Sequence, residues 1–171
     1  MAKIGIYATF LSEEQKQKIK KIASAYGYSI AYFKDTNEAA AGIADCEILY
    51  GYYPASLLPH AEKLRWLATA SAGVDSYLED CVYAHPNQVI VTNSAGSYGV
   101  TISEHMIMVI LMLMRRMPEY TEVVRQRRWE NIGAVRSILG SRFTIVGMGD
   151  IGTQLARRLK ALGAAHITGV R

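Results

Sequence analysis

Cysteine is scarce in this chain, with two residues among 171. Cys46 and Cys81 stand in no CxxC pair and in no histidine-rich spacing. This scarcity excludes a disulfide framework and argues against a metal site built from thiolates. We therefore expect free thiols, no bound metal and a cytoplasmic location.

Long apolar runs are also missing. The longest extends from Met106 to Met114, far short of the roughly 20 residues that a membrane-spanning helix needs. The N-terminal stretch MAKIGIYATFLSEEQ has too short an apolar run for a signal peptide, and acidic residues follow at once. We expect no membrane partner.

A concentrated basic surface is absent as well. The net charge is +4, but the densest basic places are only Arg115–Arg116 and the segment 125–128. Nucleic-acid binding would require a basic face carried by a recognisable motif, and none is found. A solvated helix face explains these charges, so we expect no nucleic-acid partner.

Apolar, β-type runs alternate with helical stretches over the first half of the sequence. Strands are predicted at residues 3–9, 28–33, 46–51, 66–70 and 89–92. Ser12 followed by Gln15 predicts a capping box at the start of a helix, and Gly27 predicts its end. Such alternation is typical of βαβ units with a parallel sheet. Residues 1–95 are therefore predicted to form one α/β domain.

Residues 96–140 are predicted to form a hinge and long helices. Thr101 and Glu104 have the spacing of a second capping box. The helix that follows them to Met117 is apolar nearly all round, so we expect it to be buried between layers, domains or subunits. Pro118 ends or restarts it, and an amphipathic basic helix is predicted from Glu119 to Glu130.

A glycine pattern lies between a strand and a helix in residues 141–171. The strand Phe143–Val146 is followed by Gly147, Gly149 and Gly152, and then by leucines at helical spacing. This context is typical of a dinucleotide-binding turn, in which the glycines allow a tight turn, a close approach to pyrophosphate and close helix packing. The alternative is an ordinary strand–turn–helix that uses glycine for geometry alone.

Four motifs share an order and spacing along the chain. They are Ser71-Ala72-Gly73-Val74-Asp75, Val91-Thr92-Asn93 with Gly96, Glu104-His105 with Leu111 to Arg115 and Trp129, and Gly147 to Gly152 with Asp150-Ile151. Together they resemble the D-isomer-specific 2-hydroxyacid dehydrogenase family, as its N-terminal half. Ala95 and Ser103 depart from this pattern, since proline and alanine are usual at these places.

The resemblance implies a flavodoxin-like parallel-sheet domain followed by the first β-α-β of an incomplete Rossmann domain. It also implies an NAD(P)-dependent oxidoreductase that acts on the CH–OH group of a D-2-hydroxy acid or reduces a 2-oxo acid. Backbone N–H groups of Ala72, Gly73 and Val74 are expected to hold the substrate carboxylate. Without the family, a glycine turn leading into a capped helix explains that loop better.

The cofactor is expected to bind at the glycine turn, and NADP is preferred over NAD. The expected contacts are Gly147, Gly149, Asp150, Ile151, Gly152 and Arg171. The acidic residue that accepts a hydrogen bond from the ribose 2′-hydroxyl is expected about 20 residues after the glycines. Arg171 occupies that place, and a guanidinium suits a 2′-phosphate.

The resemblance places the catalytic arginine, glutamate and histidine after residue 171, so no catalytic residue is assigned and the chain alone is expected to be inactive. His105 follows a predicted capping glutamate in a buried helix, where a packing role is the better explanation. The alternative function is a non-catalytic module for dimerisation or for sensing a dinucleotide or carboxylate. A homodimer is expected in either case, because the apolar helix needs a partner.

Overall fold

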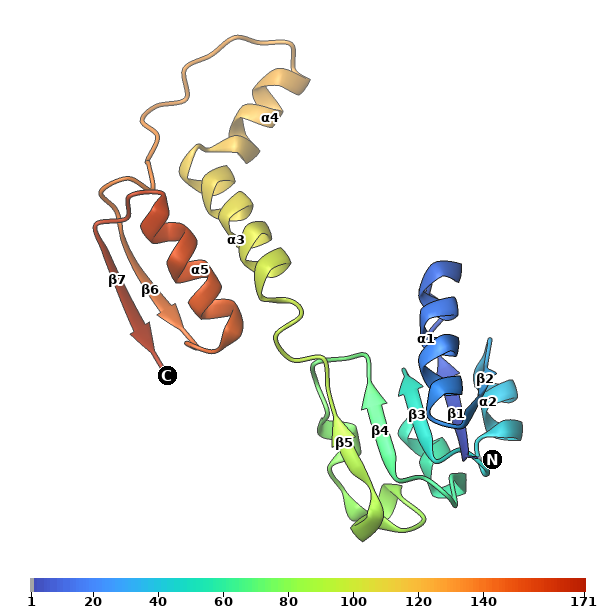
Figure 1. The fold of residues 1–171 in the computed structure, drawn as a ribbon. Helices are drawn as coiled ribbons and strands as arrows, with labels where there is room; N and C mark the ends of the chain where they lie inside the picture. Colours follow the sequence, from blue (N-terminus) through green and yellow to red (C-terminus); the bar gives the residue numbers. More distant parts are fainter. Residues whose placement is uncertain (1) are drawn as a thin grey trace. The chain divides into compact units, whose positions relative to one another are not determined.

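The computed structural model describes residues 2–171. It divides into two compact units, Met1–Ala95 and Gly96–Arg171. Each unit has its own parallel sheet and its own apolar core (Figure 1). Among the described residues, no helix is both long enough and apolar enough to cross a membrane.

The first unit is a five-stranded parallel sheet in the order β2-β1-β3-β4-β5. Its strands are β1 (Ala2–Tyr7), β2 (Tyr28–Tyr32), β3 (Ile48–Gly51), β4 (Trp66–Thr69) and β5 (Ile90–Thr92). Its helices are α1 (Glu13–Ala25) and α2 (Thr36–Gly42), with short 3-10 turns at Ala55–His60, Asp75–Tyr77, Asp80–Val82 and Pro86–Gln88. The predicted α/β class with a parallel sheet is confirmed.

Local signals in the sequence account for the ends of α1. Ser12 accepts a hydrogen bond from the Gln15 backbone at 3.2 Å, and the Gln15 side chain accepts one from the Ser12 backbone at 2.8 Å. Gly27 follows the helix at φ +74°, a left-handed conformation that favours glycine. Both the capping box and the glycine stop are therefore confirmed.

The core of the first unit joins β3 and β4 to α2 and the 3-10 turn at Ala55–His60. Leu49 and Leu67 alternate inward from the two strands, and Ile43 and Leu58 meet them from the covering elements. All four are fully buried. Full burial of such side chains stabilises the unit by about 1.5–3 kcal/mol each.

The second unit packs helices against a two-stranded parallel sheet. It consists of α3 (Gly99–Met114), α4 (Met117–Arg125), β6 (Arg142–Val146), α5 (Asp150–Ala161) and β7 (His166–Val170). Ile145, Leu155 and Leu159 form the buried centre together with Ile138, and one side of α3 packs against them. Figure 1 shows α3 lying beside α5.

Three helix boundaries differ from the sequence prediction. The helix predicted to run to Met117 ends at Met114. Thr101 is not an N-cap, because α3 already begins at Gly99 and the Thr101 hydroxyl donates to the Tyr98 carbonyl at 3.2 Å. The helix predicted to reach Glu130 ends at Arg125. After this end Arg127 takes a left-handed conformation at φ +53°, and the N–H of Arg128 donates a hydrogen bond to the Val123 carbonyl at 3.0 Å.

Only some of the apolar side chains of α3 pack against the core of the second unit. Met106, Ile107, Ile110 and Met114 face the core. The other sides carry exposed apolar residues, namely Ile102, Met108, Val109, Leu111, Met112 and Leu113. A helix that is apolar nearly all round is normally covered on all sides, but packing within the second unit covers only one side of α3.

The buried phenol of Tyr53 generates a stability prediction. Its hydroxyl is enclosed and has no hydrogen-bond partner within residues 2–171, and burial raises its pKa far above the usual range. The nearby hydroxyl of Tyr77 is matched, since it donates to the Tyr53 carbonyl at 2.6 Å. Removing an unpaired buried hydroxyl relieves a desolvation cost, whereas removing a paired one leaves an acceptor unsatisfied.

We therefore expect Tyr53→Phe to leave the free energy of unfolding unchanged or slightly increased, and Tyr77→Phe to lower it by about 1–2 kcal/mol. Urea unfolding followed by the fluorescence of Trp66, which lies in β4 of the same unit, measures both free energies of unfolding. A loss for Tyr53→Phe as large as that for Tyr77→Phe would show that the Tyr53 hydroxyl does have a partner.

Candidate functional site

A tight turn connects β6 to α5 and carries all three glycines of the predicted pattern. Gly147 follows the strand at φ +93°, and its N–H donates to the Val170 carbonyl at 2.8 Å. Gly149 is the N-cap of α5 in an extended conformation. An added Cβ at Gly147 or Gly149 meets no atom within 4 Å, so the outer side of the turn is open.

The start of α5 offers free backbone donors to that open side. The first intrahelical bond of the turn is donated by Thr153 to the Gly149 carbonyl at 3.0 Å. The N–H groups of Asp150, Ile151 and Gly152 precede it in the helix and have no intrahelical acceptor. No side chain caps this helix start. Free N–H groups and the helix dipole together favour an anion such as a phosphate.

Gly152 holds the helix tightly against the strand. It is buried, and an added Cβ would overlap the Gly147 carbonyl oxygen and lie 3.3 Å from a methyl of Ile145. Only hydrogen fits at this place, so the first turn of α5 sits directly on the end of β6. The close packing keeps the free donors of the helix next to Gly149.

Arg171 lies at the same edge of this sheet. Strands β6 and β7 pair in parallel with Val146 opposite Val170, so Gly147 and Arg171 each follow the last paired residue of their strand. Arg171 is exposed. The six residues predicted to contact a cofactor are thus gathered at one end of the second unit.

The other predicted site is the loop after β4 in the first unit. Ala72 and Gly73 are exposed, and Val74 is half-buried. The carbonyls of the loop are engaged: the Ser71 hydroxyl donates to Gly73 at 2.7 Å, and the N–H of Tyr77 donates to Val74 at 2.7 Å. In contrast, the N–H groups of residues 72–74 donate none of the hydrogen bonds found within residues 2–171. Successive free amides of this kind form a small anion-binding concavity.

Two residues that follow β5 hold this loop in place. The Asn93 side chain donates to the Ala72 carbonyl at 2.7 Å, and the Ser94 N–H donates to the Ser71 carbonyl at 2.9 Å. The Ser94 hydroxyl also reaches the Thr69 carbonyl at 3.2 Å. Sequence reasoning missed this supporting role. The signal was available, because β4 and β5 are parallel neighbours whose carboxyl ends must meet at one edge.

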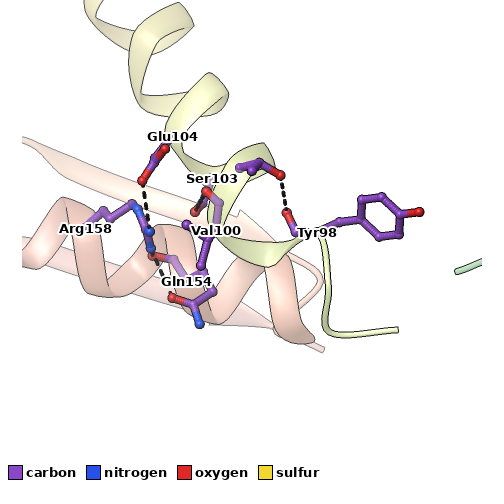
Figure 2. Close-up of polar contacts among 7 residues, drawn as sticks. Tyr98, Val100, Ser103, Glu104, Gln154 and Arg158 are labelled. Atoms are coloured by element: carbon purple, nitrogen blue, oxygen red, sulfur yellow. Dashed lines mark hydrogen bonds and ion pairs between the residues drawn. The ribbon is translucent and has the colours of Figure 1, made fainter. Parts of the chain in front are cut away.

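The contact between α3 and α5 carries the remaining polar residues of interest (Figure 2). Glu104 lies 3.5 Å from Arg158, and Arg158 also donates to the Gln154 side chain at 3.0 Å. Ser103 is fully buried, and its hydroxyl donates to the Val100 carbonyl at 2.9 Å. This bond satisfies the Ser103 hydroxyl, at a place where alanine is usual in the family that the sequence resembles.

Acid–base chemistry is not assembled within the described part of the chain. None of His60, His85, His105 and His166 makes an ion pair or side-chain hydrogen bond with an acid in residues 2–171. His105 lies on an exposed side of α3 within this single chain. Within the same residues no group of histidine, cysteine, aspartate or glutamate is arranged to hold a metal.

A cavity of about 350 Å³ lies at the opposite end of the first sheet, away from the candidate loop. Glu47, Arg65 and Gln88 line its polar part, and each precedes a strand. Ligands of open parallel sheets bind outside the carboxyl ends of the strands. We therefore assign the candidate site to the loop after β4 and not to this cavity.

Comparisons with known proteins show what the second unit is similar to. Residues 107–171 match the family model described as "D-isomer specific 2-hydroxyacid dehydrogenase, NAD binding domain". A formate dehydrogenase of Neurospora crassa is 32% identical over 113 residues, which are 64% of this chain and 30% of that protein. A D-3-phosphoglycerate dehydrogenase of Bacillus subtilis is 35% identical over 102 residues, which are 59% of this chain and 19% of that protein.

Solved structures extend the likeness to both units. The crystal structure of a D-isomer specific 2-hydroxyacid dehydrogenase family protein from Aeromonas salmonicida has a TM-score of 0.82 and 26% identity, and it covers 99% of this chain. The match takes up 53% of that protein. This chain therefore spans about half the length of that solved relative and a third or less of the two curated ones.

The unequal surroundings of the glycines predict unequal effects of substitution. We expect Gly152→Ala to lower the free energy of unfolding of the second unit by about 1–3 kcal/mol, because the methyl must displace backbone. Gly149→Ala has open space and an ordinary φ, so we expect a loss below about 1 kcal/mol. Thermal unfolding followed by circular dichroism compares the two variants, and equal losses would contradict the packing described for Gly152.

Proposed function

We propose that this chain, which matches the NAD-binding-domain model of the D-isomer-specific 2-hydroxyacid dehydrogenase family over residues 107–171 and resembles a solved member in fold, forms the substrate-binding unit and the first part of the cofactor-binding unit of an NAD(P)-dependent oxidoreductase. The intact enzyme would act on the CH–OH group of a D-2-hydroxy acid, or reduce the corresponding 2-oxo acid. In this division, residues 1–95 hold the substrate, residues 96–140 form the hinge and long helices, and residues 141–171 begin the Rossmann domain.

The glycine turn between β6 and α5 is the observation that carries this proposal. Its open outer side leaves room for a pyrophosphate, and the free N–H groups of Asp150, Ile151 and Gly152 point to an anion-binding role. The residues present thus fit a dinucleotide. When bound, the nicotinamide supplies the hydride chemistry, and the protein orients it.

The loop after β4 suits the substrate carboxylate. The free N–H groups of Ala72, Gly73 and Val74 would donate hydrogen bonds to a carboxylate oxygen, and the bonds from Asn93 and Ser94 preorganise the loop. An anion site built from backbone donors recognises the carboxylate common to all 2-hydroxy acids. It does not select among their side chains.

Residues 2–171 contain no histidine positioned by an acid for proton transfer. No histidine of residues 2–171 is paired with an acid, and a general acid–base group typically contributes 10²–10⁴-fold to a rate. We propose that the 171 residues bind the cofactor but do not turn over substrate by themselves. The same observation favours the second candidate function, a module for dimerisation or for sensing a dinucleotide or carboxylate.

The first prediction concerns binding and turnover together. Purified chain should enhance and shift NADH fluorescence on titration, and Gly149→Ala should weaken this binding by roughly tenfold, because its methyl enters the space that a pyrophosphate needs. The same preparation should not oxidise NADH in the presence of glyoxylate, pyruvate or hydroxypyruvate. Turnover at ordinary enzyme rates would contradict the proposed inactivity, and unchanged binding in Gly149→Ala would contradict the proposed site.

The second prediction concerns cofactor choice. Arg171 has no acceptor for a ribose 2′-hydroxyl, but its guanidinium matches the geometry of a 2′-phosphate. We expect NADPH to bind more tightly than NADH, and Arg171→Ala to remove most of this difference while leaving NADH affinity unchanged. Arg171→Lys is the matched control that keeps the charge. Equal affinity of the unaltered chain for the two cofactors would rule out a role for Arg171.

The third prediction concerns assembly. We propose a homodimer that covers the exposed apolar side of α3, where Val109 and Met112 are 38% and 42% exposed. Light scattering at micromolar concentration should give twice the mass of the chain, and the double variant Val109→Glu with Met112→Glu should give a folded monomer. Leu78→Glu, at another exposed apolar position, should remain dimeric. A monomeric unaltered chain would refute this assembly.

A further inference from the structure

Asp150, the first residue of α5, makes a contact outside its own helix that the glycine pattern does not require. Its carboxylate lies directly against the backbone of Gly99, the first residue of α3. An added Cβ at Gly99 would lie within 2.6 Å of both Cγ and Oδ1 of Asp150. Gly99 is buried and has no positive φ, so space and not backbone conformation explains why glycine stands there.

This contact is the first of two along a pair of parallel helices. Gly99 faces Asp150 at the helix starts, and Glu104 reaches Arg158 farther along both helices at 3.5 Å. Figure 2 shows the second contact, and Figure 1 shows the two helices side by side. The amino-terminal ends of α3 and α5 therefore lie together, at the glycine turn.

The charge of Asp150 makes this arrangement significant. A carboxylate at the start of a phosphate-binding helix would repel an anion there. At the start of α3, in contrast, it meets the partial positive charge of a helix that no side chain caps. The structure thus gives the acidic residue a favourable environment on α3 while the N–H groups of α5 remain available.

We propose that the contact between Asp150 and Gly99 is a positioning device for the phosphate-binding turn, so that Gly99 determines dinucleotide affinity without touching the dinucleotide. This inference rests on the proposed cofactor site. The contact fixes the first turn of α5 against α3 and directs the Asp150 carboxylate onto α3. Gly99 acts in it by having no side chain.

A double-mutant cycle tests the device. In the unaltered chain, Gly99→Ala forces the carboxylate away, and we expect a lower Tm and an NADH affinity weakened by roughly tenfold. In the Asp150→Ala background the three atoms nearest to the methyl are absent. There the same substitution should leave NADH affinity unchanged and should not lower the Tm, because alanine favours a helix by about 1 kcal/mol over glycine. Coupling of this kind is expected only for residues in contact.

NADH affinity is measured at a temperature where all four proteins are folded, and the Tm is measured without NADH. Equal effects of Gly99→Ala in both backgrounds would overturn the proposal. Coupling in the Tm without coupling in NADH affinity would also overturn it, since the contact would then be structural only. If the unaltered chain binds no NADH, the proposed cofactor site fails, and the positioning role fails with it. The Tm cycle would in that case still report separately whether the contact exists.

Discussion

The close approach of Gly152 to the Gly147 carbonyl is the constraint on which the second unit depends. It places the first turn of α5 directly on the end of β6, and so it determines where the free N–H groups of the helix lie. A side chain at Gly152 would separate helix from strand. The same packing brings Leu155 and Leu159, farther along α5, into the buried cluster with Ile145. The core and the candidate anion-binding turn therefore depend on one contact.

The first unit uses a different device to shape its candidate site. Its loop after β4 is held by hydrogen bonds from Asn93 and Ser94, which follow the neighbouring strand. The parallel pairing of β4 and β5 brings the two segments together, since parallel strands end at the same edge. Both candidate anion sites thus arise at the carboxyl ends of parallel strands, where open α/β sheets bind their ligands.

Much of this architecture could be predicted from periodicity and from glycine positions. The alternation of strands and helices predicted the parallel sheet of the first unit, and the Ser12–Gln15 spacing predicted the start of α1. These features are local, so they are readable from short stretches of sequence. The glycine turn was readable for the same reason, because strand, glycines and helix are contiguous along the chain.

Features that depend on distant residues, and one unusual local backbone conformation, were not predicted. The start of α3 was placed at Thr101, yet the helix begins at Gly99, where the Asp150 carboxylate packs. The roles of Asn93 and Ser94 required the pairing of β4 with β5. The helix expected to reach Glu130 ends at Arg125, and Arg127 after it takes a left-handed conformation. No glycine stands at that position to indicate this conformation. In each case the deciding contact or conformation lies outside the sequence pattern that was used.

The central claim is that the glycine turn binds the pyrophosphate of a nicotinamide dinucleotide. Titrating ¹⁵N-labelled chain with NAD and following backbone amide resonances tests it directly. The account predicts that the largest shifts fall on the amides of Gly149, Asp150, Ile151 and Gly152, which lie at the free start of α5. Shifts concentrated instead around Glu47, Arg65 and Gln88, or no shifts at millimolar NAD, would contradict it.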